Sequence, residues 1–206
     1  FHAPRSRSSR FIWLLEELNA DYEIRYVDIP RMDGSGAADP SNPHPDKKVP
    51  ALDHDGAIVT EAAAIALYLT DLHPQAGVGP TVGDPLRGAY LGWLAYYAGV
   101  IEPVVTIAFA QLGDHPVFTR TFRGVEEMKA RVRGALERGP FLLGNAFSAA
   151  DVLVVRGLQL DRPVGMAAGA EGQLLVVDEG IPAVVLVDAG RSRADRLAYN
   201  DHARPW

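Results

Sequence analysis

Three serines and three arginines stand where an apolar, helix-forming stretch begins, in "APRSRSSRFIWLLEEL", residues 3–18. A serine hydroxyl can donate a hydrogen bond to an anion or to sulfur. The first N–H groups of a helix have no partner within the helix and carry a partial positive charge. This segment therefore favours an anionic group, whether a carboxylate, a phosphate or a thiolate. The same serines could instead cap the helix, and both interpretations stay open on this pattern alone.

The sequence contains no cysteine. Disulfides, thiolate metal sites and a Cys-X-X-Cys redox pair are therefore excluded, and any sulfur chemistry must use a thiol that a ligand brings. The six histidines include no pair at the spacing of a zinc-binding helix, so we expect no metal. A serine hydrolase is disfavoured because the sequence has no Gly-X-Ser-X-Gly elbow.

Composition is that of an ordinary globular protein. The 206 residues are 48% hydrophobic and 22% charged, with a formal net charge of −6, which gives no reason to expect nucleic-acid binding. No apolar run approaches the roughly 18 residues of a membrane span, and the N-terminus lacks a signal-peptide pattern. We expect a cytoplasmic protein that does not bind membranes.

The first half of the chain reads as an α/β unit. Helical spacing of apolar residues predicts a helix over about 6–18, and period-two alternation predicts a strand over 22–26. A hairpin follows, with its turn in residues 53–56. Helix-forming residues then extend from Glu61 to about residue 72. This order predicts an N-terminal domain over residues 1–74 and a Gly/Pro-rich linker over 75–84.

The second half, 85–206, reads as helical at least to about residue 160. Apolar stripes predict a helix after Asp84-Pro85 and another over about 119–138. Ser148, three residues before Asp151 and preceded by Phe147, is a third helix-start signal. Residues 160–206 are atypical, because the apolar runs 174–177 and 184–187 favour strands.

Four segments, in this order and spacing, resemble the cytosolic glutathione S-transferase family of the bacterial type. They are the opening segment, "KVPAL" at 48–52, "TEAAAI" at 60–65 and "FLLGNAFSAAD" at 141–151. The resemblance covers roughly residues 1–160. It implies an α/β, thioredoxin-like N-terminal domain that binds glutathione and an all-α C-terminal domain. The latter would supply most of the pocket for a small hydrophobic electrophile. The family is usually dimeric, so we expect a homodimer.

Lys48, Val49 and Pro50 resemble the cis-proline motif of that family. A cis bond before proline turns the chain so that the preceding backbone can pair with an extended peptide, and glutathione is a short peptide. The resemblance gives Val49 main-chain hydrogen bonds to the cysteinyl part of glutathione and lets Lys48 approach a carboxylate. Read without the resemblance, Pro50 is an ordinary strand-entry proline beside a solvated lysine.

Glu61 and Ala62 stand where the family has an acidic residue followed by Ser or Thr at a helix start. The resemblance implies that the carboxylate pairs with the γ-glutamyl ammonium, while the hydroxyl and the helix N–H bind its carboxylate. Ala62 has no hydroxyl, so one hydrogen bond is missing, at a cost of roughly 1 to 2 kcal/mol, or about tenfold in affinity. The alternative is that Glu61 only complements the helix dipole.

The same resemblance implies that a residue near the start of the first helix donates a hydrogen bond to the sulfur of glutathione. Such a donor lowers the pKa of a thiol from about 8.5 and so creates the nucleophile. The spacing to Arg10 favours Ser6, whereas counting back from "LLEEL" favours Ser8, and Ser9 is a third candidate. Arg7 could contribute charge to the same site.

Aromatic residues at helical spacing are the candidates for walls of the second-substrate pocket, although such residues belong more often to the core. They are Tyr90, Trp93, Tyr97 and Phe109. The Ser148–Asp151 pair resembles the family's folding motif, and we assign it to stability rather than to the site.

The resemblance predicts a detoxifying transferase that activates glutathione for attack on an electrophile. Two alternatives stay open: a glutathione-dependent peroxidase, and a protein of the same fold that binds without catalysing. The absence of a hydroxyl at Ala62 and the atypical tail make the non-catalytic protein plausible. Residues 162–190 do not match the family, which indicates either an insertion or a local shift of the reading frame.

Overall fold

The computed structural model describes residues 1–157, and Phe1–Gly157 form one compact unit. The strands predicted at 174–177 and 184–187, and the insertion or frame shift proposed for 162–190, lie outside the described residues. The end of the third predicted helix, near residue 160, lies outside them too.

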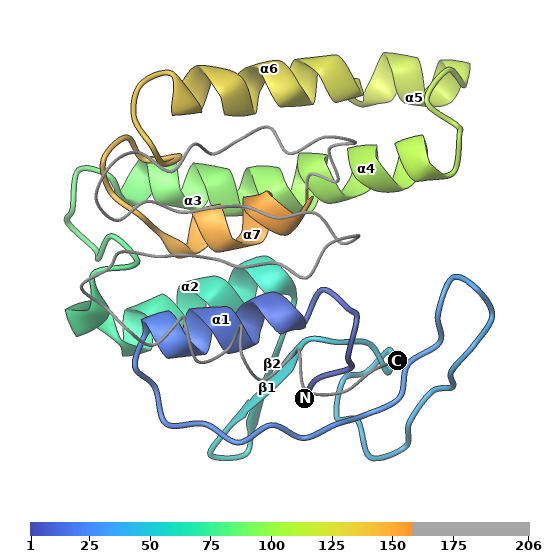
Figure 1. Cartoon of the computed structure of the whole chain (residues 1–206), viewed down its shortest axis with the longest axis vertical. Helices are drawn as coiled ribbons and strands as arrows, with labels where there is room; N and C mark the ends of the chain where they lie inside the picture. The colour runs from blue at the N-terminus through green and yellow to red at the C-terminus, as the bar shows by residue number, and fades with distance from the viewer. Residues whose placement is uncertain (158–206) are drawn as a thin grey trace, which may run out of the picture. The chain divides into compact units, whose positions relative to one another are not determined.

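The first part of the unit combines two helices with a hairpin (Figure 1). Its elements, in chain order, are α1 (Ser9–Glu17), β1 (Ala51–His54), β2 (Ala57–Thr60) and α2 (Ala62–Leu72). The predicted helix over 6–18 therefore begins three residues later than expected. Its predicted apolar face is nevertheless correct, because the side chains of Phe11, Leu14 and Leu18 are buried.

The hairpin closes through a short turn. β1 and β2 pair antiparallel, with Ala51 opposite Thr60 and His54 opposite Ala57. Asp55 and Gly56 form a two-residue turn with φ values of 52° and 85°. Two successive residues with positive φ define a type I′ turn, whose twist matches that of the strands. The hairpin is confirmed, with a turn shorter than the predicted 53–56.

The strand predicted over 22–26 is wrong in its extent. Only an isolated parallel bridge joins Tyr26 to His2, closed by hydrogen bonds from the His2 nitrogen to Arg25 (2.9 Å) and from the Val27 nitrogen to His2 (3.1 Å). The tyrosine at position 22 donates its hydroxyl hydrogen bond to Glu16 of α1. Side-chain alternation is present, but these aromatic groups do not bury one face of a sheet, since the Tyr26 side chain is exposed.

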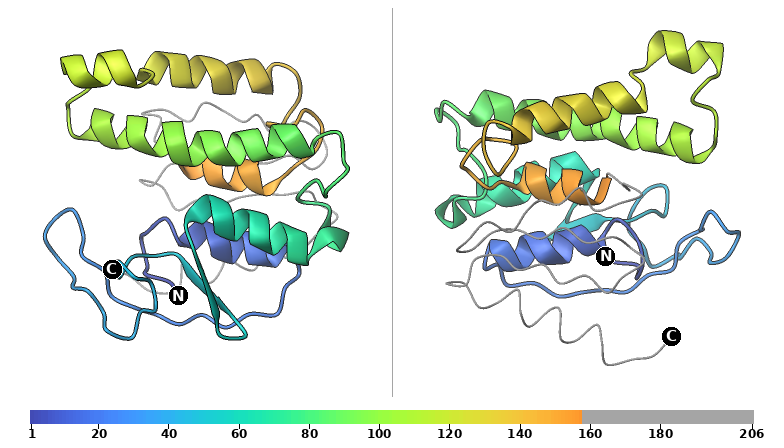
Figure 2. Two further views of the ribbon diagram at one scale, coloured as in Figure 1. Left: turned by 180° about the vertical axis from the view of Figure 1, so that it is seen from behind. Right: turned by 45° about the horizontal axis from the view of Figure 1, so that its top comes forward.

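Helices make up the rest of the described chain. A short 3₁₀ turn, η1 (Pro74–Ala76), begins the predicted linker. After it come α3 (Arg87–Tyr96), the π-helical turn η2 (Tyr97–Ile101), α4 (Glu102–Phe109), α5 (Pro116–Thr121), α6 (Val125–Leu136) and α7 (Ala149–Gly157). Figures 1 and 2 show α7 between the α1/α2 pair and α3, with α6 on the far side of α3. The boundary between two domains at residues 74–85 stays a prediction.

The helix predicted over about 119–138 is divided into α5 and α6. Gly124, the residue before α6, has extended backbone angles and so breaks the helix. Its nitrogen donates to the carboxylate of Glu127, three residues on. This hydrogen bond, which is the Glu half of a capping box, fixes the start of α6. The buried face of α6 consists of Met128, Val132 and Ala135.

The continuous helical run Arg87–Phe109 is long and apolar enough, by length and composition, to span a membrane. A core helix of a folded domain meets the same two criteria. Here the run contributes Tyr90, Leu94, Ile101 and Val104 to the core, all less than 5% exposed. The expectation that no apolar stretch reaches this length is therefore corrected for the described residues, and the buried face is consistent with a core helix.

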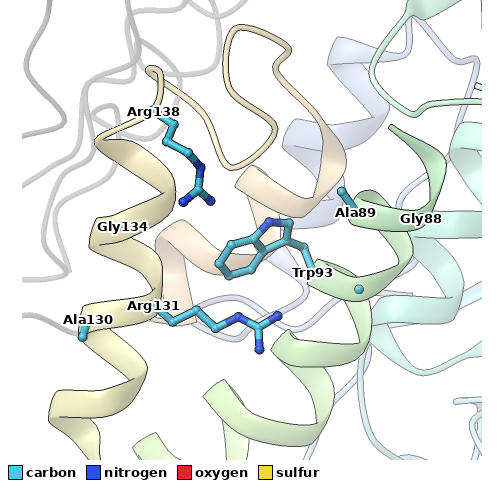
Figure 3. A pocket seen from close by; sticks show the side chains of 8 residues that line it. Gly88, Ala89, Trp93, Ala130, Arg131, Gly134 and Arg138 are labelled. Atoms are coloured by element: carbon cyan, nitrogen blue, oxygen red, sulfur yellow. The ribbon is translucent and has the colours of Figure 1, made fainter. Parts of the chain in front are cut away.

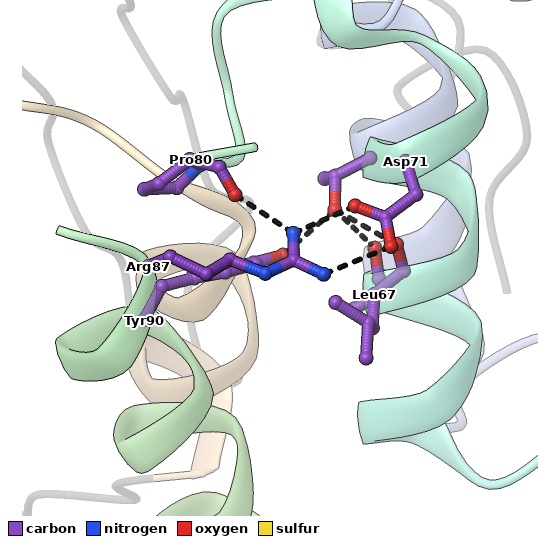
Figure 4. A network of polar contacts seen from close by, with 7 residues as sticks. Leu67, Asp71, Pro80, Arg87 and Tyr90 are labelled. Carbon is purple, nitrogen blue, oxygen red and sulfur yellow. Dashed lines mark hydrogen bonds and ion pairs between the residues drawn. The ribbon is translucent and has the colours of Figure 1, made fainter. Parts of the chain in front are cut away.

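An ion pair and a hydroxyl pair connect α2 to α3 (Figure 4). The Arg87 guanidinium donates to both carboxylate oxygens of Asp71, at 2.6 and 2.9 Å, and to the carbonyl oxygen of Pro80. Beside it, the Tyr90 hydroxyl lies 3.0 Å from that of Thr70. The hydrogen bonds from Arg87 hold the pKa of Asp71 below its usual value, so the bidentate pair is maintained at neutral pH.

A buried carboxylate fixes the start of α7. Asp151 is completely buried and accepts hydrogen bonds from the backbone nitrogens of Leu142 (2.8 Å) and Ser148 (2.9 Å) and from the Ser148 hydroxyl (2.9 Å). Phe147 stacks with Trp13 of α1 at 6.1 Å between ring centroids. The helix-start signal and its structural role are confirmed, and burial raises the pKa of Asp151 to about 6.

This raised pKa predicts a specific dependence of stability on pH. The folded protein holds the Asp151 proton up to about pH 6, whereas the unfolded chain releases it near 3.8. The contribution of this group to the free energy of unfolding is therefore fully present below pH 3.8 and falls as pH rises to 6. The fall is at most about 3 kcal/mol.

Thermal and urea unfolding between pH 4 and 7 measure this effect in wild type and Asp151→Asn. The stability of wild type relative to the variant should decrease as pH rises through this window. The exposed Asp114→Asn is the control and should parallel wild type throughout. A difference between wild type and Asp151→Asn that stays constant with pH would contradict the prediction.

Candidate functional site

One edge of the hairpin connects the three predicted stretches of the site. The backbone nitrogen of Phe1 donates a hydrogen bond to the carbonyl oxygen of Ala51 at 2.8 Å, so the segment that leads into α1 lies beside the start of β1. Ala51 in turn pairs with Thr60, the residue before Glu61. The segments that carry the serines, Pro50 and Glu61 are therefore joined through adjacent residues of one small sheet.

The segment before β1 is held by a buried asparagine. The Val49–Pro50 peptide bond is cis. Asn42 is fully buried, and its side-chain nitrogen donates to the carbonyl oxygen of Lys48 at 2.9 Å. The side chain of Lys48 is exposed, and those of Val49 and Pro50 are half-buried. No sequence pattern distinguishes Asn42, because it stands in a loop rich in turn-forming residues.

Glu61 has a backbone conformation that is unusual for a residue with a side chain. It precedes α2 with φ 68° and ψ 121°, and its side chain is exposed. A non-glycine residue in this region costs about 1–3 kcal/mol and persists only where its surroundings impose it. Its carboxylate makes no capping hydrogen bond to α2. The carboxylate is therefore presented beside the start of α2 rather than used by the helix.

The start of α2 provides backbone donors without a hydroxyl. The helix begins at Ala62, and its first-turn N–H groups are those that an α-helix leaves unpaired. They point, with the positive end of the helix dipole, toward any group bound ahead of the helix. Ala62 is half-buried. This end of α2 can bind a carboxylate through backbone N–H groups, and Glu61 beside it can bind an ammonium group.

The three candidate serines occupy different environments at the start of α1. Ser8 is only 2% exposed, whereas Ser6 and Ser9 are half-buried. The Ser6 hydroxyl lies 2.6 Å from that of Ser8 and donates to the carbonyl oxygen of Ala3 at 2.7 Å. The Ser8 hydroxyl also lies 2.7 Å from Nδ1 of His2. Ser6 and Ser8 thus belong to one hydrogen-bonded group, and Ser6 is its more accessible member.

Capping does not account for this arrangement. Ser8 occupies the N-cap position, yet its side chain makes no capping hydrogen bond to α1. Ser9 is the first helical residue, and its backbone nitrogen donates to the Ser6 carbonyl oxygen at 3.2 Å. The alternative interpretation of the serines as helix caps is therefore wrong for Ser8, whereas the Ser6 hydroxyl does accept the backbone N–H of Ser8 at 3.2 Å, just before α1. From the sequence, the nearness of His2 to the serines suggested only a hydrolase, which the lack of a Gly-X-Ser-X-Gly elbow disfavours; its contact with Ser8 is seen in the structure.

Two arginines connect the start of α1 to the helical part of the unit. Arg7, whose side chain is 56% exposed, forms an ion pair with Glu102, the first residue of α4. An exposed pair of this kind contributes about 1 kcal/mol or less to stability. Arg10 is 2% exposed and donates to the Tyr97 hydroxyl at 2.5 Å and to the Leu153 carbonyl oxygen at 3.0 Å.

Arg10 is a buried residue beside the candidate site for which the sequence predicted no role of its own. It lies four residues before Leu14 and eight before Leu18, on the buried stripe of α1. A charge on an apolar stripe is the signal that could have identified it. Its Nε atom is buried and makes no hydrogen bond within the part of the chain that the structure describes. Burial lowers the pKa of Arg10, and the Tyr97 hydroxyl opposes that shift.

Tyr97 and Glu102 complete this buried group. The Tyr97 hydroxyl donates to Glu102 and accepts from Arg10. Burial raises the pKa of Tyr97, although the positive charge of Arg10 lowers it in part. The phenol is therefore neutral at physiological pH and keeps the proton that it donates. A neutral phenol between a cation and a carboxylate links α1 to α4 without adding a third charge.

The aromatic residues expected to wall a second-substrate pocket do not share one cavity. Tyr90 and Tyr97 are buried, and Phe109 is 66% exposed. Trp93 lines a hollow of about 510 Å³ between α3 and α6, together with Arg131, Arg138 and several small residues (Figure 3). Because α7 lies between α3 and α1, this hollow is separate from the serine group (Figure 2).

Within residues 1–157, no group of three or more His, Asp or Glu side chains is placed to hold a metal ion. The serine group and the start of α2 present hydroxyl, carboxylate and backbone N–H groups. Such groups suit a small zwitterionic ligand better than a metal.

Comparison with known proteins identifies the first part of the chain. Residues 1–71 match the family model of the glutathione S-transferase N-terminal domain. Glutathione S-transferase 3 of Schizosaccharomyces pombe is 40% identical over 68 residues, which are 33% of this chain and 27% of that protein. A probable maleylacetoacetate isomerase of Caenorhabditis elegans is 32% identical over 95 residues, 46% of this chain and 42% of that protein. The chain thus matches less than half the length of these relatives.

Solved structures extend the likeness beyond the N-terminal domain. A glutathione S-transferase of Actinobacillus pleuropneumoniae superposes with a TM-score of 0.64 at 25% identity, covering 76% of this chain and 74% of that one. A sphingomonad glutathione S-transferase complexed with glutathione gives 0.59 at 26%, covering 100% and 92%. The predicted fold class, a thioredoxin-like α/β domain followed by helices, is confirmed.

The buried Arg10–Tyr97 contact predicts a cost for removing one hydroxyl. Tyr97→Phe leaves the Arg10 guanidinium with one acceptor fewer in a buried position, which should lower the free energy of unfolding by about 1–3 kcal/mol. Urea unfolding measures it. Tyr68→Phe is the matched control, because that hydroxyl bonds His54 in an exposed position (2.8 Å) and its loss should cost far less. Equal losses in the two variants would contradict the prediction.

Proposed function

Because residues 1–71 match the N-terminal domain of the glutathione S-transferases, we propose that the chain is a member of the cytosolic glutathione S-transferase family that binds glutathione and transfers it as a thiolate to a small electrophile. The observation that supports this most directly is the hairpin edge. Through Phe1, Ala51 and Thr60 it joins the start of α1, the Val49–Pro50 turn and the start of α2. A short peptide that follows this edge can reach all three at once.

In this proposal each part of glutathione has a different partner. The γ-glutamyl ammonium pairs with the exposed carboxylate of Glu61, and its carboxylate binds the first N–H groups of α2 at Ala62. The cysteinyl backbone pairs with the main chain of Val49 next to Pro50, as an added strand pairs with a sheet edge. Lys48, whose side chain is exposed, approaches the remaining carboxylate.

The sulfur then lies at the start of α1, where we assign the contact to Ser6. Ser6 is more accessible than Ser8, which is 2% exposed and faces His2. Ser9 is the first residue of α1 and therefore lies in the first turn of the helix. A hydrogen bond from Ser6, together with the positive end of α1, lowers the pKa of a thiol from about 8.5.

Conjugation needs little further chemistry from the chain. The thiolate attacks the electrophilic carbon, a C–S bond forms, and the leaving group departs with its electron pair. The thiol proton has already passed to solvent. Arg7 lies in the last turn before α1 and is paired with Glu102, so it adds positive charge near the sulfur that Glu102 partly offsets. We extend the proposal to a cytoplasmic homodimer, which size-exclusion chromatography and sedimentation would test.

One observation favours a second candidate, a protein that binds without efficient catalysis. Ala62 lacks the hydroxyl that the family has at this position, which weakens the binding of glutathione. Retention on immobilised glutathione, followed by assays with an activated chloronitrobenzene and an organic hydroperoxide, separates the cases. Turnover of the first compound supports conjugation, and turnover of the second alone supports peroxide reduction. Retention without turnover favours the binding protein.

The missing hydroxyl gives a gain-of-function prediction. Ala62→Ser adds a donor at the start of α2, so the affinity for glutathione should rise, up to about tenfold, which corresponds to about 1.4 kcal/mol. Isothermal titration calorimetry measures the dissociation constant. Ala63→Ser, one residue further along the same helix, is the control and should change the affinity little. An unchanged dissociation constant in Ala62→Ser would refute the placement of the γ-glutamyl group.

Removal of the proposed sulfur contact should act on the chemistry rather than on binding. In Ser6→Ala, kcat with an activated chloronitrobenzene should fall about 10-fold to 100-fold, because a hydrogen bond to the anionic sulfur is lost. The dissociation constant for glutathione should change less than threefold. A variant that retains the wild-type kcat would exclude Ser6 and transfer the assignment to Ser8 or Ser9.

A further inference from the structure

We infer that His2 is a positioning residue that acts on the sulfur of glutathione through two serine hydroxyls. The inference rests on the proposed function, because it concerns the group that meets the sulfur. It goes beyond it by giving a role to a residue that contacts neither glutathione nor the electrophile.

The geometry is that of a continuous hydrogen-bonded chain. Nδ1 of His2 lies 2.7 Å from the Ser8 hydroxyl, which lies 2.6 Å from the Ser6 hydroxyl. Both distances are short for hydrogen bonds of these types. Accessibility increases along the chain, from His2 and Ser8, both buried, to Ser6, which is half-buried. The chain therefore begins in the interior and ends where the sulfur is proposed to lie.

Ser8 has no other evident task. At the N-cap position its hydroxyl makes no capping bond, and besides its two partners in the chain it contacts only the backbone of Ala3, at 3.3 Å to the nitrogen and 3.4 Å to the carbonyl oxygen. Helix formation alone does not require a hydroxyl here. The contacts of the Ser8 hydroxyl instead place it between Ser6 and His2.

The direction of the hydrogen bonds follows from counting protons. Each serine hydroxyl has one proton to donate. If Nδ1 of His2 carries a proton, it donates to Ser8 and Ser8 donates to Ser6. The Ser6 proton, which bonds the carbonyl oxygen of Ala3 at 2.7 Å, then turns to the sulfur when glutathione binds. If Nδ1 is bare, Ser8 donates inward, and Ser6 receives no hydrogen bond from Ser8. Only the first arrangement directs every donor toward the sulfur.

An outward chain stabilises a thiolate more than Ser6 would alone. Hydrogen bonds in series polarise one another, and the effect is larger where water is excluded, as at Ser8. The backbone fixes His2 in place: its nitrogen donates to the carbonyl oxygen of Arg25, and its carbonyl oxygen accepts from Val27. The Tyr26 ring lies 5.7 Å from the imidazole, tilted by 56°. The imidazole is thus held by residues 25–27, which lie outside α1.

Three variants test the inference. His2→Phe keeps a ring of similar size but removes the donor, and Ser8→Ala interrupts the chain. His2→Asn keeps an N–H donor, Nδ2, at the same number of bonds from Cβ as Nδ1 of histidine. The readout is the pKa of the thiol of enzyme-bound glutathione, followed by the ultraviolet absorbance of the thiolate during a pH titration. This quantity reports on the sulfur and is not moved by a purely structural role.

In His2→Phe and Ser8→Ala the pKa of the bound thiol should rise by about 0.5–1 unit, with kcat/KM below that pKa reduced about threefold to tenfold. The double variant should be no worse than either single variant, because both act through one chain. His2→Asn should restore most of the wild-type value. The control is Ser35→Ala, which removes an exposed loop hydroxyl bonded to Asp33 and should leave the pKa unchanged.

A bound-thiol pKa that is the same in wild type, His2→Phe and Ser8→Ala would overturn the inference, even if the variants were less stable. Additive shifts in the double variant would overturn it too, because they would show two independent effects. Failure of the proposed function looks different: wild type itself would not bind glutathione or would leave its thiol pKa at the free value.

Discussion

The position of α1 depends on one buried cation. Arg10 is only 2% exposed, so its charge must be balanced by partners inside the protein. Those partners are a hydroxyl from η2 and a backbone carbonyl from α7, with the Glu102 carboxylate 3.9 Å away. The requirement fixes α1 against two helices of the second half of the chain. The serines that precede α1 are thereby placed relative to the helices that surround the rest of the site.

Much of the fold could be predicted because short-range chemistry determined it. The hairpin follows from Asp55-Gly56, which accept positive φ where few other pairs do. The start of α7 follows from Ser148 and Asp151, whose reciprocal bonding depends on residues three apart. The strand over 22–26 failed for a complementary reason. Alternation describes a chain that could pair, and only the arrangement of neighbouring segments decides whether it does.

In the candidate site, too, residues that belong to local motifs were predicted and residues that depend on the arrangement of distant segments were not. Residues recognised from local motifs, such as Pro50, Glu61 and Ser6, stand at one connected edge. Asn42 and Arg10 were not recognised, because Arg10 acts through partners distant in sequence and Asn42 acts through a loop without periodicity. His2 suggested only a hydrolase, because its hydrogen bond to Ser8 follows no motif spacing. Arg10 contacts residues 87 and 143 positions away. No spacing rule reaches that far, and only the charge on an apolar stripe indicated that such a partner must exist.

The π-helical turn η2 has a consequence for which side chains can meet. Tyr97 and Glu102 are five residues apart, and in a regular α-helix their side chains would diverge by about 140° around the axis. A π turn aligns residues i and i+5 instead, and the Tyr97 hydroxyl accordingly reaches the carboxylate. The extra residue in this turn therefore brings the Tyr97 and Glu102 side chains to the same side of the helix. Tightening this turn to α-helical geometry without deleting a residue would rotate Glu102 away from the phenol.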